Sequence, residues 1–380
     1  MNTPELRFPE FTEAWQSKKM GRFAKFSKGK GISKSDISED GETECIRYGE
    51  LYTIYNEVID KVYSRTNINH RDLILSEAND VIIPGSGETQ IDIATASCVL
   101  KSGVALGGDL NIIKTDNNGV FLSYYLNNRK KTEIARIAQG NSVVHLYSSQ
   151  LATLNINLPS ILEQQKIASF LTAVDDKLTQ LKQKKSLLEQ YKKGLIQKIF
   201  SREIRFKGEN GAEYPDWEKK KIIDFAPLQR GFDLPIDSIT KGEYPVVFSN
   251  GILKYHNEFK VKAPGIVTGR SGTIGKVTYV QNDYWPHNTS LWVTDFKGNF
   301  PMFIFHFFSK YKLERFGTGS GVPTLNRNDV HSQKEYFPAL PEQTKIANFL
   351  SALDEKINHC QLKIEKTVLY KKGLLQKMFC

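Results

Sequence analysis

A seven-residue repeat of apolar positions runs through the middle of the chain. It is formed by Ile167, Val174, Leu181, Leu188 and Leu195. Side chains at this spacing form one stripe along an α-helix, and a stripe of this length needs a second helix to cover it. The pattern predicts a continuous helix over residues 163–200, roughly 57 Å long at about 1.5 Å per residue.

The predicted helix has a recognisable start and an unusual residue near its end. Ser160, which directly follows Pro159, has the spacing of a capping box with Glu163. Gly194 lies within the pattern, although a glycine inside a helix costs about 1 kcal/mol relative to alanine. Either the helix ends or kinks near Gly194, or a second backbone approaches it closely there. Several lysines crowd the same part of the helix, and they fit a solvated face or contact with a partner.

The same pattern occurs a second time, 179 residues later. EQQKIASFLTAVDDKL (163–178) recurs as EQTKIANFLSALDEKI (342–357), with ten of sixteen positions identical, and YKKGLIQKIF (191–200) recurs as YKKGLLQKMF (370–379). The second copy supplies a helix of matching length, so the two helices are expected to pair. The residues expected in this contact are Ile167, Phe170, Val174, Leu178, Leu181, Leu188 and Leu195 in the first copy, with Tyr191 beside them, and Ile346, Phe349, Leu353, Ile357 and Leu374 in the second.

Each predicted helix follows a more variable stretch, and the two stretches also resemble each other. GNSVVHL (140–146) corresponds to GSGVPTL (319–325), and RFPEFTEAW (7–15) echoes RFKGENGAEYPDW (205–217). Short apolar runs separated by glycine-rich turns are typical of β-strands. We therefore predict an α+β protein made by tandem duplication. Its segments are expected to be a globular domain over residues 1–158, a helical region over 159–202, a second globular domain over 203–338 and a second helical region over 339–380.

Composition is typical of a globular protein in a reducing compartment. The 380 residues are enough for two domains, and 40% of them are hydrophobic. The beginning of the chain lacks the apolar run of a signal peptide, and no stretch approaches the roughly 18 apolar residues of a membrane-spanning helix. The four cysteines are scattered, without disulfide or metal-ligand spacing. A cytoplasmic protein without membrane association is expected.

The sequence nominates no catalytic residue and no metal site. GRSGTIGKV (269–277) approaches a phosphate-binding loop, but Arg270 takes the place of its first glycine and Val277 that of its hydroxyl residue. There is no GxSxG turn, no HExxH pair and no Pro-Pro dipeptide of the kind found in adenine methyltransferases. An enzymatic reaction catalysed by this chain therefore has no support from its motifs.

A net charge of +10 favours a polyanionic partner, and turns in both globular halves present side chains suited to DNA. Arginine and lysine pair with phosphates or guanine, and asparagine and glutamine pair with adenine. The candidates are Lys28, Lys30, Ser33, Lys34, Ser86, Thr89, Gln90, Asn141 and His145 in the first half, and Arg230, Arg270, Ser271, Thr273, Lys276, Asn288, Thr289, Asn326 and Arg327 in the second. The same residues fit ordinary surface loops. Corresponding loops that differ between duplicated domains favour recognition of two different DNA sequences.

Taken together, these motifs resemble the specificity subunits of type I restriction–modification systems. The two copies of the helical pattern are similar to that family's two conserved helical regions. GFDLP (231–235), GRSGTIGKV (269–277) and GSGVPTLN (319–326) are similar to phrases of its target-recognition domains. The resemblance covers essentially the whole chain, although KGKGISK and PGSGETQ in the first half depart from the pattern.

The resemblance implies a non-catalytic subunit that binds double-stranded DNA. Each recognition domain would bind one half of a bipartite site, and the two helices would pack antiparallel as a coiled-coil spacer. Methyl transfer from S-adenosylmethionine would belong to two modification subunits, and translocation and cleavage with ATP and Mg to restriction subunits. Two alternatives stay open. One is an enzyme whose site the sequence does not reveal, and the other is a stand-alone DNA-binding or scaffold protein with self-associating helices.

Overall fold

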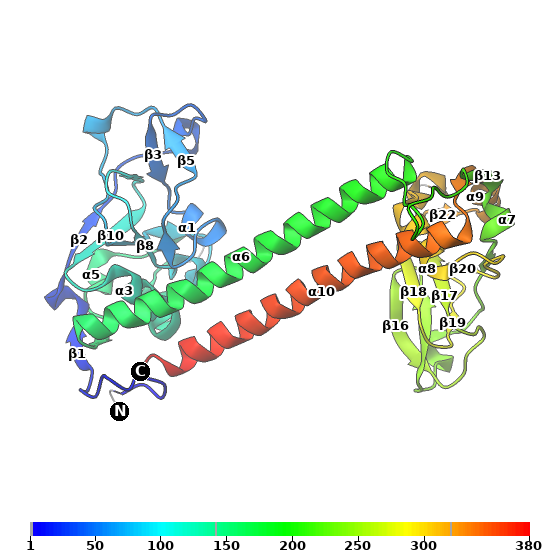
Figure 1. Cartoon of the computed structure of the whole chain (residues 1–380). Coiled ribbons are helices and arrows are strands. Elements are labelled where there is room, and N and C mark those ends of the chain that lie inside the picture. Colours follow the sequence, from blue (N-terminus) through cyan, green and yellow to red (C-terminus); the bar gives the residue numbers. More distant parts are fainter. Residues whose placement is uncertain (1–2, 141–142, 320) are drawn as a thin grey trace. The chain divides into compact units, whose positions relative to one another are not determined.

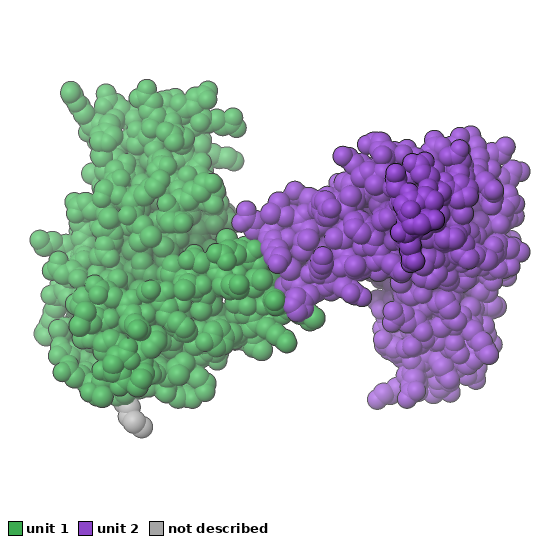
Figure 2. Space-filling model, viewed as in Figure 1, with its two compact units in different colours: residues 1–182, 362–380 green, residues 183–361 purple. Residues whose placement is uncertain are grey.

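The computed structural model describes residues 3–140, 143–319 and 321–380. These residues form two compact units (Figure 2). Unit 1 comprises residues 1–182 and 362–380, and unit 2 comprises residues 183–361. Each unit contains one mixed α/β domain together with part of each of two long helices, α6 (Ile161–Phe200) and α10 (Leu340–Lys377) (Figure 1).

The domain of unit 1 is built on a five-stranded sheet with the strand order β2-β10-β6-β8-β4. Its strands are β2 (Ala24–Lys28), β10 (Leu110–Thr115), β6 (Asp80–Pro84), β8 (Ser97–Val99) and β4 (Val58–Ile59). Neighbouring strands are antiparallel except for the parallel pair β4 and β8. Strand β6 has the sequence DVIIP and is buried along its whole length, as expected for a strand covered on both faces.

Smaller sheets and short helices complete unit 1. A three-stranded sheet has the order β5 (Ser64–Thr66), β3 (Thr43–Ile46) and β9 (Ala105–Leu106), and two-stranded sheets join β1 (Gln16–Lys19) to β12 (Asn155–Leu158) and β7 (Ser86–Gly87) to β11 (Val144–His145). The helices are α1 (Glu50–Thr53), α2 (Gln90–Ile93), α3 (Gly119–Tyr125), α4 (Lys131–Ile137) and α5 (Ser148–Leu151).

The domain of unit 2 repeats this plan with a four-stranded sheet in the order β14-β20-β17-β18. Its strands are β14 (Leu228–Arg230), β20 (Ser290–Val293), β17 (Gly265–Gly269) and β18 (Val277–Val280). The smaller sheets are β16 (Gly251–His256) with β15 (Tyr244–Phe248) and β19 (Trp285–Pro286), β13 (Glu218–Lys221) with β23 (Lys334–Phe337), and β21 (Gly317–Thr318) with β22 (Thr324–Leu325). The helices are α7 (Ile222–Phe225), α8 (Pro301–Lys310) and α9 (Arg327–His331).

The two domains share much of their strand pairing, although β4 of unit 1 has no counterpart in the main sheet of unit 2. Both three-stranded sheets combine one antiparallel and one parallel pair around a central strand, β3 in unit 1 and β15 in unit 2. In each domain a strand near its beginning pairs with the strand that leads into the next long helix, β1 with β12 and β13 with β23. The duplication predicted from the repeat is therefore present in the topology of the sheets.

Each long helix completes the hydrophobic core of both units. In unit 1, Ile167 and Leu171 of α6 and Leu374 of α10 belong to the same buried cluster as Trp15 and Phe121. In unit 2, Ile199 of α6 and Ile346 of α10 join the cluster around helix α8. Helix α8, with the sequence PMFIFHFFSK, starts with a proline and is apolar on most sides, which suits a buried helix.

The predicted seam positions are buried to different degrees. Ile167, Val174, Leu181, Ile346, Leu353 and Leu374 are buried, whereas Phe170, Leu178, Leu188, Leu195, Phe349 and Ile357 are half-buried. Tyr191, which the pattern places beside the seam, is 56% exposed, so that expectation is wrong. A stripe that one partner covers is narrower than a helix face, and Tyr191 lies outside it.

The structure corrects two expectations about the helices. Neither Gly194 nor Gly373 ends its helix, and a Cβ built at either position meets no described atom within 4 Å. Close approach of another part of this chain is therefore not the reason for either glycine. The capping box is incomplete, because Ser160 Oγ accepts a hydrogen bond from the Glu163 N–H at 3.3 Å while the Glu163 carboxylate binds elsewhere. Among the described residues, no helix is long and apolar enough to cross a bilayer.

Candidate DNA interface and helix contacts

A buried glutamate at the start of each long helix fixes the helix to its domain. In unit 1 the Glu163 carboxylate accepts hydrogen bonds from Arg7 Nε and Nη2, both at 2.7 Å, and from Trp15 Nε1 at 3.3 Å. In unit 2 Glu342 accepts from Arg205 Nε at 3.1 Å and Nη2 at 2.8 Å, and from Trp217 Nε1 at 3.0 Å. These contacts were not predicted, although the echo of RFPEFTEAW in RFKGENGAEYPDW contains both arginines and both tryptophans.

The residue after each glutamate repeats a second set of contacts. Gln164 Oε1 accepts from the Asn118 N–H at 3.0 Å, and its Nε2 donates to Asn117 Oδ1 and Pro159 O, both at 3.0 Å. Gln343 makes the equivalent three contacts, with the Phe300 N–H, Asn299 Oδ1 and Pro338 O. The side-chain oxygen and nitrogen of both Gln164 and Gln343 are thus hydrogen-bonded inside the protein. These repeated residues therefore serve the fold and not a ligand.

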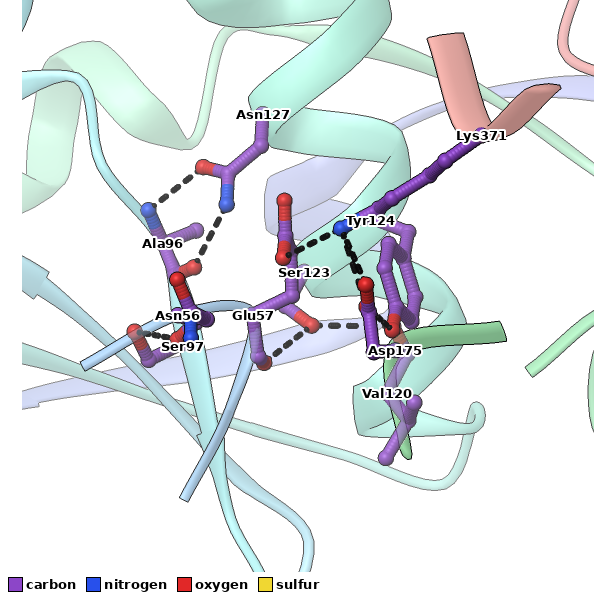
Figure 3. Close-up of polar contacts among 10 residues, drawn as sticks. All are labelled: Asn56, Glu57, Ala96, Ser97, Val120, Ser123, Tyr124, Asn127, Asp175 and Lys371. Carbon is purple, nitrogen blue, oxygen red and sulfur yellow. Dashed lines mark hydrogen bonds and ion pairs between the residues drawn. The ribbon is translucent and has the colours of Figure 1, made fainter. Parts of the chain in front are cut away.

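A half-buried ion-pair cluster joins both long helices to the domain of unit 1 (Figure 3). Lys371 of α10 contacts Asp175 of α6 at 2.8 Å and Glu57, just before β4, at 3.3 Å. Tyr124 of α3 donates to Asp175 Oδ2 at 2.5 Å. Burial is the main cause that raises the pKa of Tyr124, and the hydrogen bond to Asp175 raises it further. The Ser123 hydroxyl donates to Glu57 O at 2.8 Å, which holds the segment that carries Glu57 in place.

Unit 2 contains the same ion pair at the same repeat positions. Lys192 Nζ lies 2.5 Å from Asp354 Oδ1, and each residue is separated by 179 positions from its counterpart in unit 1. His306 of α8 takes the place of Tyr124, with its Nε2 at 3.4 Å from Ser351 Oγ. Burial lowers the pKa of His306 to about 4, so the imidazole is neutral near pH 7.

Each long helix also carries a second stripe that faces away from the buried seam. The stripe consists of Gln183, Leu187, Gln190, Gly194 and Gln197 on α6, and of Leu362, Lys366, Leu369, Gly373 and Gln376 on α10. The spacing alternates between four and three residues and coincides between the two copies. Leu187 is 58% exposed, Leu362 55% and Leu369 70%. We call these two stripes the outward stripes.

In unit 2 several predicted DNA-binding residues converge at one edge of the main sheet. The backbone N–H groups of Arg270 and Ser271 both donate to Thr289 O, at 2.9 and 3.1 Å. Arg270 Nη1 donates to Asn288 O at 3.3 Å. The Leu325 N–H donates to Arg270 O at 2.7 Å, which places β22 beside the same loop. Loops that are distant in sequence therefore form one surface.

Polar side chains at this edge also bind one another. Arg230 pairs with Asp233 at 2.6 Å, and Asn288 Nδ2 donates to the same carboxylate. The Asn288 hydrogen bond, helped by Arg230, lowers the pKa of Asp233, so the group is ionised near pH 7. Lys276 Nζ donates to Asn250 O at 2.5 Å, at the turn between β15 and β16.

The remaining candidates of unit 2 differ in their availability. Thr273 is exposed in the 270–276 loop. Asn326 caps helix α9, because its side-chain oxygen accepts from the Asn328 N–H at 3.0 Å, and Arg327 is the first residue of that helix and is exposed. The Asn326 oxygen is therefore engaged within the protein, while its amide nitrogen stays available.

In unit 1 Lys28 and His145 lie at one edge of the domain, where both contact the ring of Tyr147. Lys28 ends β2, and His145 pairs with Ser86 between β11 and β7. Ser86 is 6% exposed, so the expectation that its side chain contacts DNA is not supported. Thr89 caps helix α2 by accepting from the Asp92 N–H at 3.1 Å, and Gln90 begins that helix and is exposed.

The other predicted residues of the first half lie elsewhere. Lys30 donates its backbone N–H to Leu106 O at 2.9 Å, and Ser33 and Lys34 lie at the short 3₁₀ turn that follows. Ser33 Oγ contacts Asp36 Oδ2 at 2.6 Å. Lys30, Ser33 and Lys34 are all exposed, beside the three-stranded sheet. Asn141 lies outside the described residues.

Backbone hydrogen bonds show which positions of the two edges are equivalent. The Gly29 N–H donates to Leu110 O and the Gly231 N–H to Ser290 O, both at 3.0 Å, so Lys28 matches Arg230. The Leu146 N–H donates to Gly85 O at 2.9 Å, as the Leu325 N–H does to Arg270 O, so Gly85 matches Arg270. The same scaffold thus presents different side chains in the two domains.

The duplicated domains have a known counterpart in sequence. The profile of the type I restriction modification DNA specificity domain matches residues 12–190 and 214–367. The chain belongs to this family. It contains two such specificity domains in tandem, which confirms the two-domain interpretation of the repeat.

Curated relatives carry the same family assignment. The chain is 27% identical over 238 residues to the type I restriction enzyme MjaVIII specificity subunit of Methanocaldococcus jannaschii, covering 60% of this chain and 53% of that protein. It is 24% identical over 278 residues to the putative type I restriction enzyme MjaX specificity subunit of the same organism, covering 66% and 65%. The matches thus span about half to two thirds of the length of these relatives.

Solved specificity subunits share the fold. The S subunit of a type I restriction-modification system from M. genitalium has a TM-score of 0.69 at 17% identity, covering 100% of this chain and 99% of the other. The HsdS subunit from Thermoanaerobacter tengcongensis has a TM-score of 0.51 at 12% identity, with the same coverage. An α+β fold with a long helix after each specificity domain is therefore the architecture of this chain.

Proposed function

We propose that this chain is the DNA specificity subunit of a type I restriction–modification complex. In this proposal each domain binds one half of a bipartite site on double-stranded DNA. The observation that carries the proposal is the pair of equivalent sheet edges with different side chains, Lys28 and Gly85 in unit 1 against Arg230 and Arg270 in unit 2. Duplicated scaffolds with different polar side chains suit recognition of two different sequences.

We further propose that α6 and α10 pack antiparallel as the spacer between the half-sites. The contacts within each unit support this direction. In unit 1 the beginning of α6 and the last turns of α10 share a core, and in unit 2 the last turns of α6 and the beginning of α10 do so. We also propose the domain boundaries that the sequence predicts. The domains extend over residues 1–158 and 203–338, and the helical regions over residues 159–202 and 339–380.

The outward stripes are the proposed docking surfaces for two modification subunits. A four-three spacing is the pattern by which one helix packs on another. The two stripes occupy equivalent repeat positions, so two copies of one partner would fit them. In this proposal the partner subunits bind S-adenosylmethionine, restriction subunits bind ATP and Mg, and this chain contributes no catalytic residue.

The proposal is tested by exchanging the first domain. Residues 1–158 would be replaced by the corresponding part of a relative, and the chimera would be expressed with its modification subunit. We expect methylome sequencing to show one half of the methylated motif changed and the other half unchanged. Exchange of residues 203–338 is the matched control and should change the opposite half.

Two outcomes would contradict the proposal. If both halves of the motif change in either chimera, the domains do not recognise DNA separately. If the purified chain methylates or cleaves DNA without a partner, it is an enzyme and not a specificity subunit.

A further inference from the structure

Tyr147 is an exposed aromatic side chain at the same edge of unit 1 as Lys28 and His145. The tyrosine is 46% exposed. Its ring stacks on the His145 ring, with centroids 6.4 Å apart and planes 24° apart, and Lys28 Nζ lies 5.8 Å from its centroid. Two stacked rings and a cation thus share one surface in a domain of a basic protein.

The backbone holds this aromatic ring in place without burying it. The Tyr147 N–H donates to Gln150 Oε1 at 2.9 Å, and the Tyr147 carbonyl accepts from the Leu151 N–H at 3.2 Å, so the residue caps helix α5. His145 exchanges two backbone hydrogen bonds with Gln139, at 2.9 and 2.7 Å. An exposed ring on a fixed backbone loses little conformational freedom when it binds a partner.

Tyr147 occupies the position that Asn326 has in unit 2. Each residue directly follows the leucine, Leu146 or Leu325, whose N–H donates to the sheet-edge loop. Each also caps a short helix, α5 in unit 1 and α9 in unit 2. The equivalence therefore relates an exposed tyrosine to a residue that sequence reasoning had already nominated for DNA contact.

We propose that Tyr147 determines part of the DNA sequence that unit 1 recognises. The ring and hydroxyl contact the edge of a base pair, where apolar contact favours the thymine methyl group and the hydroxyl can hydrogen-bond a base. Lys28, beside the ring, contacts the neighbouring phosphate, which contributes affinity without sequence preference. This inference rests on the proposed function and adds to it a residue and its chemistry.

The test uses the full chain assembled with its modification subunit. Tyr147→Ala should weaken binding to the methylated motif about 5- to 150-fold and relax one position in the half assigned to unit 1. Tyr147→Phe should keep the apolar contact and most of the affinity. Lys28→Ala should weaken all sequences alike and lower the salt dependence of binding by about one charge.

Tyr63 provides the matched control in the same unit. It is 60% exposed and has Lys61 Nζ at 5.2 Å from its ring, but it lies next to β4 and β5, away from the sheet edge that carries Lys28. Tyr63→Ala should leave the motif and the affinity unchanged. Unchanged binding by Tyr147→Ala, or an equal loss on specific and random DNA, would overturn the inference. A parent complex without sequence preference would instead refute the proposed function.

Discussion

Glu163 and Glu342 are buried carboxylates that meet the same kinds of partner, an arginine and a tryptophan from the beginning of the preceding domain. Their side chains are 1% and 0% exposed. A buried charge of this kind is tolerated because its hydrogen bonds are complete, and removing one partner leaves the other charge unpaired. Each glutamate therefore links the beginning of its long helix to the beginning of the preceding domain.

Loss of the Glu163 charge should destabilise unit 1. Glu163→Gln leaves the largely buried Arg7 without its counter-ion, and we expect a loss of about 3–5 kcal/mol in the free energy of unfolding, measured by urea denaturation. Glu10→Gln removes an exposed partner of Lys166 at 3.6 Å and serves as the control. Its effect should stay below about 1 kcal/mol. Equal effects of the two variants would refute a special role for the buried pair.

The buried His306 should make the stability of unit 2 depend on pH. Its pKa is lowered from 6.5 to about 4, so the folded protein binds this proton more weakly than the unfolded chain. The free energy of unfolding is therefore highest above about pH 6.5. It falls as the pH decreases toward 4, by about 3 kcal/mol for this residue. Urea denaturation between pH 7 and 4 measures the loss.

A variant separates this residue from other acid effects. In His306→Gln the decrease in unfolding free energy between pH 6.5 and 4 should be smaller by about 3 kcal/mol. His359→Gln, which removes an exposed imidazole of α10, is the control. An identical pH dependence for His306→Gln and the parent protein would show that His306 titrates alike in the folded and unfolded states.

At the scale of the elements, the glycines of the two YKKG motifs separate stability from assembly. A Cβ at Gly194 or Gly373 meets no described atom, and both residues lie inside continuous helices. Alanine at either position should therefore raise helix stability by about 1 kcal/mol in urea denaturation. Gly119→Ala should do the opposite, since its Cβ would lie 2.4 Å from Asn79 O.

The same variants test the outward stripes. If a partner helix packs closely at Gly194 and Gly373, the added methyl groups should lower the affinity for the modification subunit while the isolated chain becomes more stable. Titration of the labelled modification subunit measures this affinity. Unchanged affinity in the double variant would place the docking surface elsewhere.

At the scale of the whole molecule, the repeat predicted the helices and the duplication because long-range identity and heptad spacing are visible in sequence. It did not predict the Glu163 and Glu342 anchors, because their partners are distant in sequence and each residue type is common. Tyr147 was missed for a similar reason. The correspondence of GNSVVHL (140–146) with GSGVPTL (319–325) already aligns Tyr147 with Asn326. Nothing in HLYSSQL, however, distinguishes a helix-capping, exposed tyrosine from an ordinary loop residue, and only the structure shows that Tyr147 lies beside Lys28 and His145.

The contact between Leu6 and Lys377 has a consequence for how such a chain can be connected. The Leu6 N–H donates to Lys377 O at 2.8 Å, and Glu5 pairs with Lys377 at 2.6 Å. In unit 2 the Ile204 N–H donates to Lys198 O at 3.2 Å, at the equivalent positions, where the backbone is continuous. The end of each long helix therefore contacts the segment that begins a domain. For α6 this segment follows directly in the chain, and for α10 it is the N-terminal segment of unit 1. A permuted gene that joins residue 380 to residue 1 through a short linker and opens between Arg202 and Glu203 should encode a protein that unfolds at the same urea concentration as the parent and directs the same methylation motif.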